Sequence, residues 1–326
     1  MKVYYLHVAL AILTCGTVAV PTHAGSVTFG SGTNQFTMDF VTIGNPGNPP
    51  NPQNQSSSTA GSVGYTFEIG TYEVSRDTIT KFNASQSLQI SLGDMTDLGG
   101  NTPQKPATGM TIVEAAKFVN WLNTSSGYQA AYQFSTGANE NALSWIGNSG
   151  YDQANPYRNK FSKYALTSRD EWHKAAFYDP NKGISGGYWL YPNASDTAPN
   201  PVTGGTAPNT AVYSQAITQG PANVNDAGGL SAYGVMGLAG NVWEWQEFGG
   251  LGGSRSMAGG NWIGDKDQFQ NRFYFILGGT QLTARSLGFR VVSLASSAAP
   301  VPEPSMMVMA TLLGLGGYIG KRRMKK

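Results

Sequence analysis

The chain has 326 residues, of which 40% are hydrophobic and only 12% are charged. Its length suits one large domain or two small ones. The 14 Phe, 16 Tyr and 7 Trp can form a core, which excludes a disordered chain, and the 42 Gly are typical of turns and short strands.

The formal net charge of +2 is unevenly distributed along the chain. Six of the 21 basic residues are Lys2 and the basic residues of the last six positions, so the region between holds 15 basic against 18 acidic residues. This balance of −3 excludes a basic field for nucleic acid. Beyond residue 24 the sequence has no Cys and one His, His173, which excludes disulfides, thiolate catalysis and His-cluster metal sites.

The N-terminus has the pattern of an export signal. Lys2 precedes an apolar run over residues 8–20, and residues 22–24 form a small-x-small pattern suited to signal peptidase. We predict that residues 1–24 are a signal peptide. A membrane anchor is the alternative, but the run is short for a bilayer.

Residues 25–60 are expected to hold a first strand and then a loop. The loop follows from the Pro, Asn, Gln and Ser that dominate residues 45–58. Two alternating stretches come next, at residues 65–69 and 72–74, and each predicts a short strand.

Two amphipathic helices are predicted further along, each opening with a capping box. Thr111 and Glu114 form the first box, and Ser168 and Glu171 form the second. Residues 179–230 then consist almost entirely of turn-forming residues, so we expect an irregular region held in place by aromatic side chains.

The C-terminal part of the chain combines a predicted strand with a second targeting signal. The strand covers residues 287–292. Residues 300–326 then join a Pro-Glu-Pro element, a short apolar stretch and a basic cluster. This tail resembles the PEP-CTERM sorting signal of Gram-negative bacteria. The resemblance implies transient membrane anchoring, removal by an exosortase and delivery to the cell envelope, outer surface or extracellular matrix; a plain C-terminal anchor is the alternative.

Six motifs occur in order through the body of the chain, at residues 69–75, 115–122, 164–172, 240–245, 259–262 and 288–290. Together they resemble the formylglycine-generating (sulfatase-modifying) enzyme family over residues 36–294. The resemblance implies an α+β fold: a single loop-rich domain with a C-type-lectin-like core, two main helices and short strands. We further expect Trp243 and Trp245 to be core residues and Arg290 to hold loop carbonyls or a carboxylate.

The resemblance implies an oxygen-dependent oxidase whose copper-binding cysteines this chain lacks. By the resemblance, the two cysteine positions fall near Gly264 and Phe269, and neither is Cys. Copper(I) requires soft thiolate ligands, so no copper and no formylglycine-generating activity are expected. Whether the chain is an enzyme of another kind is left open.

A calcium site around the motif at residues 240–245 is also implied. By position it would use the carbonyl groups of Gly240 and Val242 and the carboxylate of Glu244, while Gly237 lacks the side-chain oxygen usual at its position. The alternative is that Glu244 is a loop carboxylate that accepts backbone N–H bonds.

Residues 259–272 are predicted to form one wall of a binding groove. Trp262 and Phe269 would offer apolar faces to a ligand. Apolar faces combined with polar side chains suit glycans or extended peptides. The alternative is that Trp262 is a core residue and the loop is collapsed. The polar contacts would come from four side chains of this loop: Asn261, Asp265, Asp267 and Arg272.

These features predict an exported, envelope- or matrix-associated module that binds exopolysaccharide, another glycan, a peptide or a surface protein without catalysis. Two alternatives remain. One is an enzyme of the same fold whose acid–base chemistry uses the charged loop Asp265, Lys266, Asp267 and Arg272. The other is a purely structural matrix protein.

Overall fold

A computed structural model of the chain describes residues 23–54, 57–137, 140–247, 255–272, 275–277 and 282–295. Within these residues no helix is long and apolar enough to cross a membrane. The predicted signal peptide, apart from its last two residues, and the predicted sorting tail lie outside the described residues.

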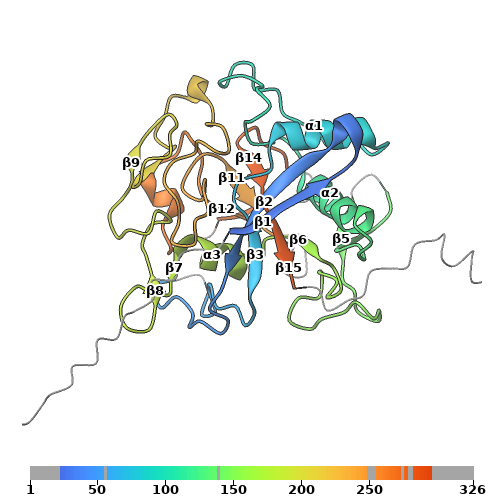
Figure 1. Ribbon diagram of the computed structural model, residues 1–326, viewed down its shortest axis with the longest axis horizontal. Coiled ribbons are helices and arrows are strands. Elements are labelled where there is room, and N and C mark those ends of the chain that lie inside the picture. Colours follow the sequence, from blue (N-terminus) through green and yellow to red (C-terminus); the bar gives the residue numbers. More distant parts are fainter. Residues whose placement is uncertain are drawn as a thin grey trace, which may run out of the picture.

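A five-stranded antiparallel sheet forms one half of the core. Its strand order is β1-β2-β3-β15-β6, so β15, the last strand among the described residues, lies in the interior of the sheet (Figure 1). The alternating pattern of residues 65–69 appears as β3. The strands are β1 (His23–Phe29), β2 (Phe36–Ile43), β3 (Phe67–Gly70), β6 (Tyr164–Leu166) and β15 (Val291–Leu294).

A four-stranded sheet with the order β13-β12-β11-β14 forms the other half of the core. Its strands are β11 (Trp243–Trp245), β12 (Arg255–Ala258), β13 (Phe275–Leu277) and β14 (Leu287–Phe289). The single strand expected at residues 287–292 is therefore two strands, one in each sheet, separated by Arg290.

Three α-helices occur in the part of the chain that the structure describes: α1 (Arg76–Ser85), α2 (Ile112–Ser125) and α3 (Arg169–Phe177). Both predicted capping boxes are present, because Thr111 caps α2 with Glu114 and Ser168 caps α3 with Glu171. Helix α1 is an addition to the two helices predicted from the sequence.

Aromatic packing joins α1 and α2 to the hairpin of β1 and β2, and Figure 1 shows all four on the same side of the molecule. Phe118 on α2 stacks on Phe36 at 6.1 Å between ring centroids and meets Phe82 of α1 edge-on at 5.4 Å. Phe118 also contacts Phe289 of β14. These rings connect the helices with both sheets, in the offset and edge-on arrangements that aromatic side chains favour.

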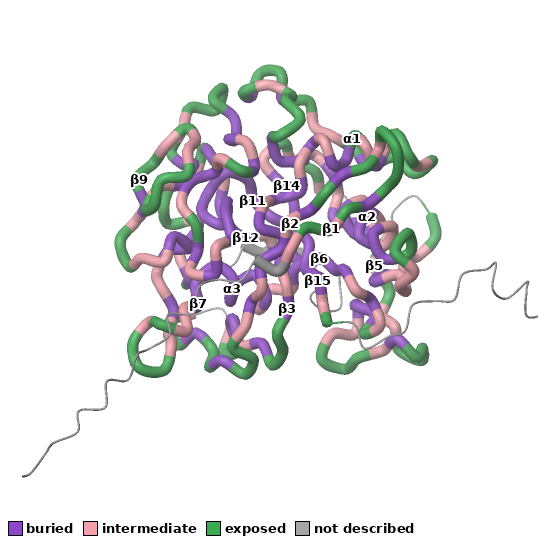
Figure 2. Tube along the Cα trace, viewed as in Figure 1, coloured by how far each residue is buried: buried purple, intermediate pink, exposed green. Residues whose placement is uncertain are grey.

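The region between α3 and β11 is irregular, as expected. Figure 2 shows its loops exposed at the periphery around a buried centre. Short paired segments occur here and after α2, namely β4 (Gln133–Phe134), β5 (Ala142–Leu143), β7 (Tyr178–Asp179), β8 (Gly187–Tyr188), β9 (Asn200–Pro201) and β10 (Thr210–Ala211). Three short 3₁₀ helices complete the described elements, at Gly32–Asn34, Ile217–Gln219 and Lys266–Phe269.

Residues 72–74 correct one prediction, because they do not form a strand. The N–H of Val74 donates to the carbonyl of Phe289, and the carbonyl of Val74 accepts from the N–H of Ala107. These bonds hold the segment as an irregular connection between β3 and α1, in which Glu73 is buried and Tyr72 is partly exposed.

Candidate functional site

The two positions near which the resemblance places the family's cysteines, Gly264 and Phe269, lie among packing contacts. Phe269 is 2% exposed, and its ring meets those of Tyr213 and Tyr191 at centroid distances of 5.1 and 6.0 Å. At Gly264 a Cβ atom would collide with the side-chain oxygen of Gln268. Neither position supplies a copper donor, so the residues present do not fit copper.

Trp262 is a core residue in this structure. It is 1% exposed and packs in a cluster with Met95, Leu98, Val212, Ala222 and Val242, while its indole N–H donates to the carbonyl of Ile217 at 3.1 Å. The expectation that Trp262 and Phe269 offer apolar faces to a ligand does not match their placement, because burial leaves both rings out of contact with solvent.

The polar side chains of the same loop lie at or near the surface, and three of them form hydrogen bonds within the loop. Asp265 caps the 3₁₀ helix by accepting from the N–H of Asp267, and Asp267 accepts from the amide of Gln270 at 2.6 Å. Asn261 accepts from the N–H of Gly264 at 2.9 Å. Arg272 is exposed.

A buried ion pair lies where the two sheets meet. Arg290 and Glu244 are both 0% exposed, and Nη2 of Arg290 donates to Oε1 of Glu244 at 2.7 Å. Arg290 also donates to the carbonyl groups of Gly70 and Met236, each at 2.8 Å. This is the role expected for Arg290: one guanidinium group joins the end of β3, the loop at Met236 and Glu244 of β11.

Glu244 is saturated by protein donors, which bears on the calcium site implied by the resemblance. Besides Arg290, the indole N–H of Trp172 donates to its Oε2 at 2.8 Å. Calcium requires six or more oxygen ligands, and both carboxylate oxygens of Glu244 already accept from the cation Arg290, one of them also from Trp172. Gly240, Val242 and Glu244 therefore do not fit a calcium ion in this arrangement.

Gly240 has the tight backbone approach expected of it. Its φ is 78°, and an added Cβ would collide with the carbonyl oxygen of Val212. The next residue, Asn241, also has a positive φ of 57°. Its amide then points inward to a second acidic residue.

Glu73 is that second residue, and sequence reasoning missed it. It is 3% exposed, and the Asn241 amide lies 3.0 Å from both of its carboxyl oxygens. Burial, with the nearby charge of Glu244, raises the pKa of Glu73 to about 8 against the opposing effect of Arg290. The segment at residues 72–74 was expected to be a strand, and only the tertiary structure brings Glu73 to Glu244.

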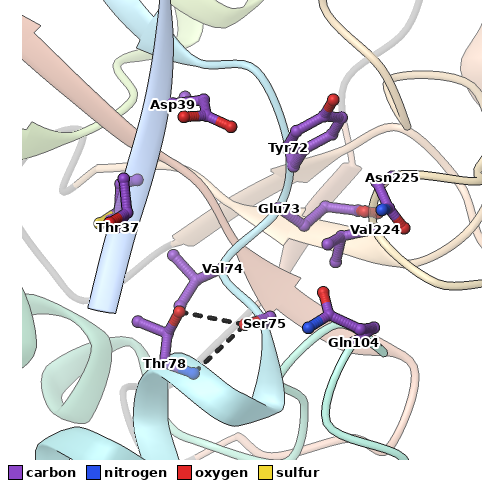
Figure 3. A pocket seen from close by; sticks show the side chains of 12 residues that line it. Thr37, Asp39, Tyr72, Glu73, Val74, Ser75, Thr78, Gln104, Val224 and Asn225 are labelled. Carbon is purple, nitrogen blue, oxygen red and sulfur yellow. Dashed lines mark hydrogen bonds between the residues drawn. The ribbon is translucent and has the colours of Figure 1, made fainter. Parts of the chain in front are cut away.

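A polar cleft of about 190 Å³ opens beside Glu73. Figure 3 shows Thr37 and Asp39 of β2 on one side of it, Tyr72, Glu73 and Asn225 on the other, and Gln104 with Ser75 and Thr78 in the lower part of the view. Residues from four separate segments therefore converge here, and none of them belongs to the loop at residues 259–272.

A second cleft, of about 400 Å³, lies next to another buried ion cluster. Arg158 bridges Glu171 and Glu247, donating to Glu171 Oε1 at 2.7 Å and to Glu247 Oε1 at 2.7 Å. Tyr65 donates its hydroxyl to Glu171 at 2.8 Å. Attraction to Arg158 holds the pKa of Glu171 below its usual range against the effect of burial, whereas burial raises the pKa of Glu247.

Comparison with known proteins identifies the class that this fold and these motifs define. Residues 16–295 match the sulfatase-modifying factor enzyme 1-like domain family, and the chain belongs to that family. Comparison with curated protein sequences gave no match.

Solved structures agree with this family fold. Treponema denticola variable protein 1 superposes with a TM-score of 0.51 and 18% identity, covering 82% of this chain and 98% of that one. CarF gives a TM-score of 0.51 and 18% identity, covering 78% and 98%. PvdO from Pseudomonas aeruginosa gives 0.50 and 14%, covering 82% and 97%. At these identities the likeness supports the fold and no particular activity.

Proposed function

We propose that this protein is an exported, non-catalytic member of the sulfatase-modifying factor family that binds a glycan, peptide or matrix component at the cell envelope. One observation carries the proposal: the ring of Phe269 is packed into the core at one cysteine position, and Gly264 occupies the other. The fold is kept while the copper donors are absent, which is expected because a fold can persist after its catalytic residues are lost.

Export is supported by the two ends of the sequence. The apolar run and cleavage pattern of residues 1–24 favour secretion, and the tail at residues 300–326 favours sorting by an exosortase to the outer surface or exopolysaccharide matrix. A ligand would then come from what is present there, such as exopolysaccharide, other glycans or surface proteins.

Binding is favoured over a purely structural role because the surface holds open polar clefts. The cleft beside Glu73 and the cleft beside Tyr65 are both lined by side chains that can form hydrogen bonds. Acid–base catalysis by Asp265 and Asp267 is less favoured, since these carboxylates cap and brace their own loop.

The non-catalytic part is tested with the purified domain, copper, oxygen and a sulfatase-motif peptide, followed by mass spectrometry of the peptide cysteine. We expect no formylglycine, because copper(I) has no thiolate ligand. A family member that retains both cysteines serves as the positive control. Turnover by this protein at a rate comparable with that control would contradict the proposal.

The binding part is tested by sedimenting the domain with exopolysaccharide from the producing bacterium. We expect the folded domain to bind and a heat-unfolded sample to remain free. If neither exopolysaccharide nor surface extract retains the folded domain, the structural-protein alternative replaces the proposal.

A further inference from the structure

The polar cleft between β2, residues 72–78 and residues 224–225 has the features of a ligand site. It draws its walls from Asp39, Tyr72, Gln104 and Asn225 (Figure 3). We propose that this cleft binds one neutral sugar ring of a glycan. The inference rests on the proposed binding function and assigns it a place and a ligand class.

Side chains at the mouth of the cleft are available to a ligand. Gln104 and Asn225 are exposed, and neither side chain bonds to another group of the residues described. The hydroxyl of Tyr72 is likewise unbonded within that part of the chain. The backbone at Gln104 is nevertheless fixed, because its carbonyl accepts from the N–H of Val224 at 2.8 Å. The amides thus project from an ordered backbone.

The chemistry of these groups matches hydroxyls that both donate and accept. Each amide offers a carbonyl oxygen and two N–H donors, and the carboxylate of Asp39 accepts. Neighbouring hydroxyl groups of a pyranose present the complementary set. Val74 and Val224 line the same cleft but are only 2% and 5% exposed, so the contacts to a ring would be mainly polar.

The charges in the cleft select against acidic ligands. The described lining holds two carboxyl groups, Asp39 and Glu73, and no Lys or Arg. A uronate, phosphate or sulfate would lose its hydration without gaining a cationic partner, so its binding free energy would be unfavourable. Neutral hydroxyl groups do not carry this cost of desolvating a charge.

The size of the cleft favours a single ring over a longer buried segment. Its volume of about 190 Å³ lies below the ~300–1,000 Å³ of pockets that enclose drug-sized ligands. The cleft is open to solvent, with Gln104 and Asn225 exposed, so the rest of a glycan chain would continue outward.

The larger cleft beside Tyr65 is a weaker candidate. Its deepest charged group, Arg158, already bonds to Glu171, Glu247 and the carbonyl of Leu166. Tyr65 also donates its hydroxyl inward. Arg158 and Tyr65 are therefore already bonded within the protein, whereas Gln104 and Asn225 of the smaller cleft are exposed.

The test is ligand-observed NMR with the whole domain and the methyl pyranosides of glucose, mannose and galactose, with glucuronate as the charged comparison. We expect saturation transfer to at least one neutral glycoside and none to glucuronate. The double variant Gln104→Ala/Asn225→Ala should weaken that binding by about tenfold or more, because two pairs of hydrogen bonds are lost. The matched control Asn200→Ala/Gln153→Ala removes the same side chains elsewhere on the surface and should bind as the wild type does.

The outcomes separate this inference from the proposed function. If exopolysaccharide binds and Gln104→Ala/Asn225→Ala leaves that binding unchanged, the binding function stands and this cleft is not its site. If glucuronate binds as well as the neutral glycosides, the ligand class is wrong. If no glycoside and no exopolysaccharide binds the wild type, both proposals fail.

Discussion

At the scale of single residues, two buried carboxyl groups lie beside one guanidinium group where the two sheets meet. Arg290 neutralises Glu244, and Glu73 lies close by with a neutral amide, that of Asn241, as its partner. A second ionised carboxylate in this buried place would be repelled by the first, so the proton on Glu73 is retained to higher pH.

This arrangement predicts a specific dependence of stability on pH. The pKa of Glu73 is about 8 in the folded protein against an ordinary value of 4.5. Its contribution is therefore complete below pH 4.5 and is lost as pH rises toward 8, at a rate of at most about 1.4 kcal/mol per pH unit. In Glu73→Gln this loss should disappear. Urea-unfolding midpoints between pH 5 and pH 8.5 provide the measurement.

The control for Glu73→Gln is Glu140→Gln, a partly exposed carboxylate paired with Lys117. This variant should follow the pH profile of the wild type. Parallel profiles for the wild type and Glu73→Gln would mean that Glu73 is ionised in the folded protein throughout this range.

Single residues differ in how far the sequence could predict them. Arg290 was correctly expected to hold carbonyls and a carboxylate, because an Arg beside a buried strand has few other partners. Trp262 is buried in the core, which was the alternative rather than the main prediction. The sequence around an aromatic residue in a polar loop is the same whether its ring contacts a ligand or packs in the core.

At the scale of elements, the capping boxes are the local signals that determine where helices begin. In α2, Thr111 accepts from the N–H of Glu114 at 3.1 Å, and Glu114 accepts from the N–H of Thr111 at 2.7 Å. Both bonds involve near neighbours in sequence, which is why the sequence predicted this boundary.

Thr111→Ala should lower the free energy of unfolding by about 1 kcal/mol, because N–H groups of the first turn lose their acceptor. Denaturant unfolding monitored by circular dichroism measures the change. The matched control is Thr80→Ala, at an exposed position inside α1, where alanine should be neutral or slightly stabilising. An equal loss in both variants would attribute the effect to the threonine side chain in general rather than to the cap.

Helix α1 escaped prediction for a physical reason. Ser75 caps it, but position 78 is Thr rather than Glu, so no capping box marks its start. Its buried apolar side chains are few, chiefly Ile79 and Phe82. The helix is stabilised by packing of Phe82 on α2, which becomes visible only when the helices are brought together.

At the scale of the whole molecule, six short motifs in order were enough to predict a single α+β domain, since each lies in or beside an element of the core. The polar cleft could not be predicted in the same way. Its walls come from residues near 38, 74, 104 and 224, which no local pattern relates to one another.

Processing at both ends is the prediction that concerns the chain as a whole. Intact mass of the protein isolated from its native host should correspond to a start near Gly25 and to loss of the segment after Pro304. Replacing Glu303 by Ala should leave the tail in place if an exosortase reads the Pro-Glu-Pro element. A wild-type product that still carries residues 321–326 would exclude removal by an exosortase.

The division of residues 287–294 between two sheets has a consequence for the order in which the domain assembles. A chain that has emerged only as far as residue 286 lacks β14, the parallel partner of β11, and β15, which lies between β3 and β6. It also lacks Arg290, so Glu244 would be without its counter-charge. Without this stretch the five-stranded sheet is divided in its interior and β11 lacks its parallel partner, so the domain should not reach its folded state until nearly all of its sequence is available.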